Sequence, residues 1–276
     1  MSIAVRTLSL LLATVVTGVA TTAARQGPAP APRATARVVV ELFTSEGCSS
    51  CPAADDLLRE WLTTQPVAGV ELVGLSEHVD YWDRLGWRDP FSSSAFSARQ
   101  SAYDAAVFRD NRVYTPQLVI DGRLEAIGSD ASAVRRAIVE ASRQPKAMVD
   151  VSISVEGADR LRVLVRVHVP SAVPRQGAAE IVLAVIEDGL ATKVARGENG
   201  GRTLRHAAVT RSLTTLGAVD ASARDHTLHG SVPLSASWSR ANVRLVALLQ
   251  ERDSRRILGA ATVGLETTTA RFGGQR

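Results

Sequence analysis

Cysteine is scarce in this sequence of 276 residues, which contains only Cys48 and Cys51. Two cysteines three positions apart cannot join distant parts of a fold. A bridge between them adds little stability, because the entropy of closing so short a loop is small. The short spacing therefore argues against a purely structural disulfide and leaves the pair available for chemistry.

Blocks of like charge are also missing. The 32 lysines and arginines and the 28 aspartates and glutamates are spread along the chain, and the net charge is +4. A nucleic-acid-binding protein needs a clustered basic stripe. We therefore interpret the charges as a solvated surface and expect no nucleic-acid partner.

Long apolar runs are absent after the first 24 residues. The one candidate, Thr7–Ala20, follows Arg6 and precedes small residues up to Ala24, which is the pattern of a secretory signal peptide over residues 1–24. The alternative is a membrane anchor, but the run of about 14 residues is shorter than the roughly 20 that a span needs. We expect a periplasmic or secreted protein without stable membrane insertion after cleavage.

The chain after the signal peptide divides into two regions. Residues 25–35 are rich in alanine and proline and predict a disordered linker. Residues 36–145 predict an α/β domain with a mixed sheet flanked by helices. Its expected strands are 36–43, 70–76, 117–120 and 124–127, and its expected helices are 51–63, 94–108 and 131–143.

After Pro145 the pattern becomes β-rich. Residues 146–265 predict a smaller all-β, sandwich-like domain, and residues 266–276 a flexible tail. The expected strands are 149–155, 162–169, 180–187, 227–234, 242–250 and 257–265.

The central motif is Cys48-Ser49-Ser50-Cys51, between a buried strand and an amphipathic helix. Unpaired N–H groups and the dipole at a helix N-terminus favour a thiolate. We expect Cys48 to present an exposed sulfur there, with Cys51 on the same face, able to resolve a mixed disulfide. Zinc is the alternative, but it needs two more ligands, and the five histidines form no H-x3-5-H pair.

The second motif is Tyr114-Thr115-Pro116, directly before a strand. A cis bond at Pro116 would lay backbone groups of Thr115 beside the two thiols. An ordinary trans proline that opens the strand is the alternative. The presence of the C-x-x-C motif favours the cis form, and we place Tyr114 among the substrate-binding residues.

Residues 36–145 resemble a thioredoxin fold, and longer motifs resemble the secreted domain-of-unknown-function 1223 family. That family joins a thioredoxin-like domain to a second C-terminal domain. The resemblance implies Cys48 as the attacking thiol, Cys51 as the resolving thiol and Pro116 as the cis-proline. It is carried by VELFTSEGCSSCPAAD, LSEHVDYWDRLGWRDPF, YTPQLVIDG and GENGGRTLRHAAVTR.

The residues around the cysteines depart from the thioredoxin pattern. The hydroxyls of Ser49 and Ser50 can donate to a thiolate and lower its pKa, whereas Glu46 opposes this by like charge. We place all three among the substrate-binding residues. Thioredoxin has a buried acid on the strand before its dithiol; Glu41 is the nearest candidate, one residue further from the first cysteine, and an edge or surface glutamate is the alternative.

His78 and a second set of polar residues each have more than one interpretation. His78 follows the second strand and either faces a substrate, joins the cysteines in a copper site, or lies in a loop packed by aromatic residues. A second cluster either contacts the first domain or a partner, or is ordinary loop polarity. Its members are Glu198, Asn199, Arg202, Arg205 and His206.

These patterns favour an exported thiol-disulfide oxidoreductase-like protein. We expect its partners to be protein thiols or disulfides, or a redox partner protein, and we expect no cofactor and assign no metal ligand. Two alternatives stay open: a periplasmic copper-binding module that uses Cys48, Cys51 and His78, and a redox-silent thioredoxin-like scaffold.

Overall fold

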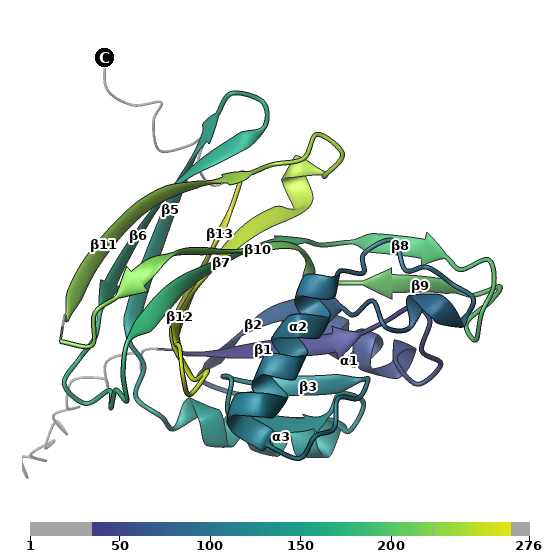
Figure 1. Ribbon diagram of the computed structural model, residues 1–276, viewed down its shortest axis with the longest axis horizontal. Helices are drawn as coiled ribbons and strands as arrows, with labels where there is room; N and C mark the ends of the chain where they lie inside the picture. Colours follow the sequence, from purple (N-terminus) through teal and green to yellow (C-terminus); the bar gives the residue numbers. More distant parts are fainter. Residues whose placement is uncertain (1–34, 223, 266–276) are drawn as a thin grey trace, which may run out of the picture. The chain divides into compact units, whose positions relative to one another are not determined.

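The computed structural model describes residues 35–222 and 224–265, which form a mixed α/β fold (Figure 1). The predicted signal peptide, the predicted linker up to residue 34 and the predicted tail lie outside the described residues. Within the described part of the chain, no helix is long and apolar enough to cross a membrane.

The first half of the described chain follows the predicted order of strands and helices. The predicted helix 94–108 differs, because its last turn widens and the Arg109 N–H donates to the Asp104 carbonyl at 2.6 Å. The elements are β1 (Ala36–Thr44), α1 (Pro52–Thr64), β2 (Val70–His78), η1 (Asp83–Leu85), α2 (Ser94–Tyr103), η2 (Asp104–Phe108), β3 (Gln117–Ile120), β4 (Leu124–Ile127) and α3 (Ala131–Ser142).

Strand β1 is the centre of this half. It pairs with β2 in parallel and with β3 in antiparallel orientation, and β3 pairs with β4. Its side chains alternate between two cores, as the period of a strand requires. Val38, Val40 and Leu42 pack with residues of α1 and α3, whereas Phe43 packs with Tyr103 of α2 on the other face.

The second half consists mainly of strands. The six predicted strands are found within two residues of their expected ends. The elements are β5 (Met148–Glu156), β6 (Arg160–His168), β7 (Ala179–Glu187), β8 (Leu190–Lys193), β9 (Thr203–His206), β10 (Val209–Val219), β11 (Asp225–Pro233), η3 (Arg240–Asn242), β12 (Val243–Glu251) and β13 (Ile257–Gly264).

Two sheets pack together in this second half. A three-stranded sheet, β11-β6-β5, shares one apolar core with β7, β12 and β13. This packing differs from the separate all-β sandwich that the sequence predicts. The layer that faces the three-stranded sheet is part of an eight-stranded mixed sheet in the order β13-β12-β7-β10-β2-β1-β3-β4.

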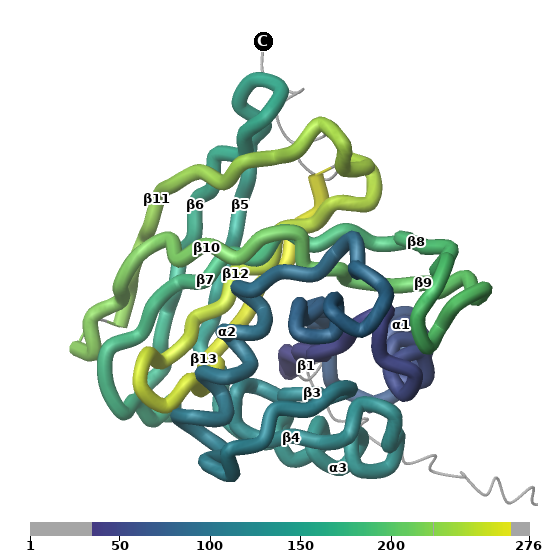
Figure 2. Tube along the Cα trace, turned by 45° about the vertical axis from the view of Figure 1, so that its right-hand side comes forward, coloured from purple at the N-terminus to yellow at the C-terminus, as the bar shows by residue number. Residues whose placement is uncertain are grey.

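The two halves are therefore joined by a continuous sheet (Figures 1 and 2). Strand β10 meets β2 at one position, Val209 opposite Ser76, and the Ser76 N–H donates to the Ala208 carbonyl at 2.8 Å. A core of side chains from both halves lies beside this junction, with Val73 and Leu75 packed against residues of β7 and β12. The domain boundary after residue 145 stays a prediction.

Candidate functional site

The C-x-x-C motif links the end of β1 to the start of α1. Cys48 and Cys51 form a disulfide, with their Cα atoms 5.5 Å apart. Cys51 is the N-cap of α1, and its carbonyl accepts hydrogen bonds from the N–H groups of Ala54 and Asp55. Pro52 follows in the first turn, where no N–H is needed. The pair thus lies at the positive end of a helix dipole.

The exposed sulfur expected at Cys48 is not observed. Cys48 is 1% exposed and Cys51 is fully buried, whereas Ser49 and Ser50 are exposed. The Ser50 hydroxyl lies 3.3 Å from the Cys48 sulfur. A reacting group must therefore approach Cys48 past Ser50 or through a movement of this loop.

The Tyr114-Thr115-Pro116 motif lies beside the disulfide. The Thr115–Pro116 peptide is cis, as the sequence predicts. The Thr115 carbonyl oxygen is 3.9 Å from Cys48 Sγ, and the Thr115 hydroxyl accepts a hydrogen bond from Trp82 Nε1 at 2.8 Å. Tyr114 is half-buried, and its hydroxyl donates to Glu125 at 3.1 Å.

Glu46 lies beneath the motif, and the structure corrects its expected role. It was expected to contact substrate, but it is fully buried. Its carboxylate accepts a hydrogen bond from Trp87 Nε1 at 2.8 Å and lies 3.1 Å from His206 Nε2. Its backbone N–H donates to Asp89 at 2.8 Å. Because Trp87 and His206 occupy its carboxylate, Glu46 stabilises the loop that carries the cysteines from inside the protein.

His206 is a buried cation between two acidic side chains. Its Nε2 contacts Glu46, and its Nδ1 lies 3.8 Å from Asp55 Oδ1, which is an ion-pair distance rather than a hydrogen bond. Burial opposes a charge on the ring, but the interactions with Asp55 and Glu46 outweigh it and raise the pKa of His206 to about 10. His206 is therefore protonated at neutral pH.

His78 does not face a substrate, because its side chain is fully buried. Its Nδ1 is 2.7 Å from Asp89 Oδ2, and its ring packs edge-on against His206 at 4.8 Å between centroids. Burial raises the pKa of Asp89, but the charge and hydrogen bond of His78 and two backbone N–H groups outweigh it, so the pKa is lowered overall. Among the residues that the structure describes, no group of three His, Cys, Asp or Glu side chains is placed to hold a metal ion. The copper hypothesis stays a prediction.

Glu41 is not the acid beside the cysteines, and it is not a surface glutamate. It is fully buried on the face of β1 opposite α1, where it binds Arg99 at 2.6 Å and accepts the Tyr103 hydroxyl at 2.6 Å. Glu77 lies in the same cluster, 3.5 Å from Arg99. Burial and the nearby Glu41 raise the pKa of Glu77 well above its ordinary value, although Arg99 opposes this.

The polar cluster of the second half reaches the motif. The Ser49 N–H donates to Glu198 at 3.0 Å, and Asn199 Nδ2 donates to the carbonyls of Glu46 and Cys48, both at 2.9 Å. Contact with the first region was one of two open interpretations, and Glu198, Asn199 and His206 make it.

The family model for proteins of unknown function DUF1223 matches residues 39–250, which is most of the chain. The chain belongs to the DUF1223 family. Its match extends across both halves of the fold, from β1 to β12.

Solved structures agree with this DUF1223 fold. A crystal structure of a protein from Agrobacterium tumefaciens is 30% identical, with a TM-score of 0.62 over 83% of this chain and 94% of that chain. HBP35 of Porphyromonas gingivalis is 14% identical, with a TM-score of 0.62 over 88% of this chain and 79% of that chain, and this likeness shows the fold alone. The search of curated proteins found no match.

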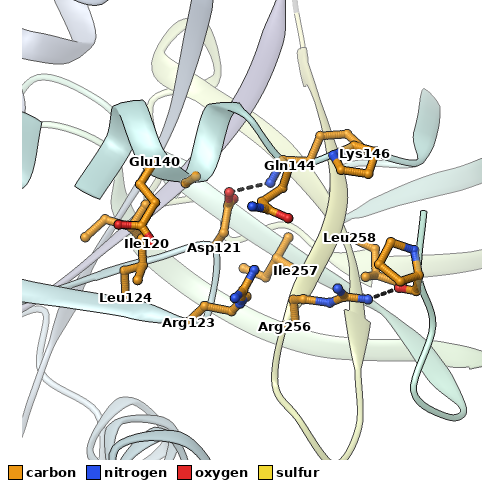
Figure 3. Close-up of a pocket in the computed structure, with 13 residues that line it drawn as sticks. Ile120, Asp121, Arg123, Leu124, Glu140, Gln144, Lys146, Arg256, Ile257 and Leu258 are labelled. Atoms are coloured by element: carbon orange, nitrogen blue, oxygen red, sulfur yellow. Dashed lines mark hydrogen bonds and ion pairs between the residues drawn. The ribbon is translucent and has the colours of Figure 1, made fainter. Parts of the chain in front are cut away.

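A pocket of this DUF1223 chain is lined by Ile120 and Asp121, at the end of β3 (Figure 3). Gln117, beside Pro116, pairs with Phe43 near the motif, whereas Asp121 follows the far end of the strand. Asp121 forms an ion pair with Lys146 and accepts a hydrogen bond from the Val39 N–H at 2.9 Å. The Asp121 carboxylate therefore has its partners within the fold.

Asp55 and Asp89 are two buried acids of this DUF1223 site that the sequence motifs did not single out. Asp55 follows Cys51 by four positions in a predicted helix, so the spacing alone places both on one helix face. Asp89 had no comparable signal, because it lies in an irregular segment.

Proposed function

We propose that this protein is an exported thiol-disulfide oxidoreductase that acts on protein thiols through Cys48 and Cys51. One observation carries the proposal: the disulfide at the N-terminus of α1 has the Thr115 carbonyl oxygen 3.9 Å from Cys48 Sγ. A helix N-terminus stabilises the thiolate that such chemistry needs.

We also propose that residues 36–145 are a thioredoxin-like unit. The strand order β2-β1-β3-β4, with β1 and β2 parallel and β3 and β4 antiparallel, supports this. Helices α1 and α3 share one core on one face of these strands, and α2 contributes Tyr103 to the other face.

The exchange reaction uses each cysteine once. The Cys48 thiolate attacks one sulfur of a substrate disulfide, the substrate S–S bond breaks, and the other substrate sulfur leaves as a thiolate that takes up a proton. The Cys51 thiolate then attacks the Cys48 sulfur, forms the Cys48–Cys51 bond and releases the second substrate thiol. The substrate gains two electrons and the protein loses two; the reverse direction oxidises a dithiol.

In this proposal, Asp55 accepts the proton of the Cys51 thiol. Helical side chains lean toward the N-terminus, so the Asp55 carboxylate leans over the turn that begins at Cys51. It is buried, Thr44 donates to its Oδ2 at 3.1 Å, and its Oδ1 has no hydrogen-bond partner among the described residues. This oxygen lies 3.8 Å from His206 Nδ1 and can accept the thiol proton.

Exposed apolar side chains next to Pro116 support a polypeptide substrate. Val113, two residues before Thr115, is 45% exposed, and Ile127, opposite Gln117, is 56% exposed. An unfolded or extended chain offers apolar side chains to such positions.

The test is reduction of insulin disulfides by dithiothreitol, with the wild type and with Cys48→Ser. We expect acceleration by the wild type only. Cys51→Ser should trap a mixed disulfide at Cys48 that mass spectrometry detects. Equal rates with the wild type and Cys48→Ser would refute the proposal.

The proposed location rests on the signal-peptide pattern and on the disulfide itself, because disulfides persist in oxidising compartments. Cell fractionation with mass analysis of the mature N-terminus tests it. A chain that keeps residues 1–24 in the cytosolic fraction would contradict it.

A further inference from the structure

We infer that Asn199 is a positioning residue for the Cys48–Cys51 pair, supplied by the other half of the chain. The inference rests on the proposed function and extends that site beyond residues 36–145. Asn199 lies in the turn between β8 and β9, a two-stranded hairpin that lies beside α1 (Figures 1 and 2).

The side-chain amide of Asn199 is fixed at both ends. Its Nδ2 donates one hydrogen bond to the Glu46 carbonyl and one to the Cys48 carbonyl, which uses both of its hydrogens. Its Oδ1 accepts a hydrogen bond from Arg202 at 2.7 Å. Asn199 is only 1% exposed, so water does not replace these bonds.

Other residues of the hairpin bring Asn199 to the motif. Glu198 accepts the Ser49 N–H, and His206 contacts the Glu46 carboxylate. Gly197 adopts a φ of 80°, and a Cβ there would approach the Cβ of Trp87 to 3.1 Å. The close contact between the hairpin and the first half therefore requires glycine at this position.

The contact with Cys48 bears directly on the thiol pair. The Cys48 carbonyl accepts the Cys51 N–H at 3.3 Å as well as Asn199 Nδ2. Holding this carbonyl fixes the backbone from which the Cys48 sulfur projects toward Cys51. A fixed geometry raises the effective concentration of one thiol at the other, so Asn199 favours the disulfide over the dithiol.

The test measures the equilibrium of the Cys48–Cys51 couple with glutathione. Full-length mature protein is equilibrated in glutathione buffers, quenched in acid, alkylated and weighed by mass spectrometry. We expect Asn199→Ala to shift the equilibrium about tenfold toward the dithiol, which equals about 30 mV. Arg202→Gln, at an exposed side chain that orients Asn199, should shift it in the same direction by a smaller factor.

Asp130→Ala is the control, because it removes the N-cap of α3 and lowers stability without touching the motif. We expect an unchanged equilibrium constant. The inference is overturned, while the proposed function stands, if Asn199→Ala and Arg202→Gln both keep the wild-type equilibrium constant. It is also overturned if Asp130→Ala shifts that constant as far as they do. A wild-type disulfide that does not exchange with glutathione would overturn both.

Discussion

His206 keeps a positive charge inside the protein because two carboxylates face it. Its Nε2 is 3.1 Å from Glu46, Asp55 lies on its other side, and the pKa is raised to about 10 despite burial. In the unfolded chain the pKa of histidine is about 6.5. The folded protein therefore holds a proton that the unfolded chain releases between these values.

This difference predicts a pH dependence of stability. The contribution of His206 is fully present below about pH 6.5 and is lost as pH rises through about 10, with a slope of up to about 1.4 kcal/mol per pH unit. Urea unfolding at pH 6 to 9 should show this decline in the wild type and a flatter profile in His206→Gln. The control is His168→Gln, since His168 and its partner Asp225 are exposed. Equal slopes in all three proteins would contradict the assignment.

Glu77 is a buried acid whose replacement by a neutral residue should stabilise the protein. Burial raises the pKa of Glu77 when the chain folds, so its cost to stability grows as pH rises above about 4.5, the pKa of an ordinary glutamate. Glu77→Gln removes this cost and should increase the free energy of unfolding at pH 7. Glu71→Gln, on the same strand but half-exposed, should change it little. A destabilised Glu77→Gln would show that Glu77 is ionised and needs Arg99.

Helix α1 gives a kinetic prediction for the proposed proton acceptor. Asp55→Asn cannot accept the Cys51 proton, and general-base catalysis contributes roughly 10²-fold or more. We expect the mixed disulfide to resolve about 10²-fold more slowly, measured by quenched mass spectrometry with a peptide disulfide. Asp56→Asn is the matched control, because Asp56 is the next residue and its side chain is 64% exposed. Similar rates in both variants would remove Asp55 from the mechanism.

The helices and strands show where sequence patterns suffice. Strand β1, helix α1 and the Asp-Gly hairpin between β3 and β4 were predicted, because their apolar period and turn residues are local signals. The hairpin β8–β9 and strand β10 were not. The sequence of β10, Val209–Val219, mixes polar and apolar residues without regular alternation, and it is a strand because it bonds to β7 and meets β2. Such pairing has no local signature.

The candidate site divides in the same way. Cys48, Cys51 and Pro116 could be predicted, because their motifs are short and lie in a recognisable strand-turn-helix context. The burial of Glu46 could not, because its partners His206 and Asn199 lie 160 and 153 residues further along the chain. The burial of His78 could not either, because its ring packs against the distant His206. Successive side chains of a strand point to opposite faces, so Glu41 lies on the face of β1 opposite Val40 and Leu42, which pack toward α1, the helix whose N-cap is Cys51.

The shared sheet predicts that both halves unfold together. Leu75 of β2 is fully buried against residues of β7 and β12, so Leu75→Ala should cost about 2–5 kcal/mol. Hydrogen exchange with mass spectrometry should show equal destabilisation of peptides from both halves. Leu85→Ala, at a side chain that is 52% exposed, should leave both unchanged. Destabilisation limited to residues 36–145 would instead support two independent domains.

The reduction potential of the Cys48–Cys51 couple tests the redox role most directly. It is obtained by titrating the mature protein against glutathione or dithiothreitol buffers and counting free thiols by mass. A catalytic pair is expected to be reversible, with a potential between about −120 and −270 mV. A potential below about −300 mV, which is typical of structural disulfides, would contradict the proposed function.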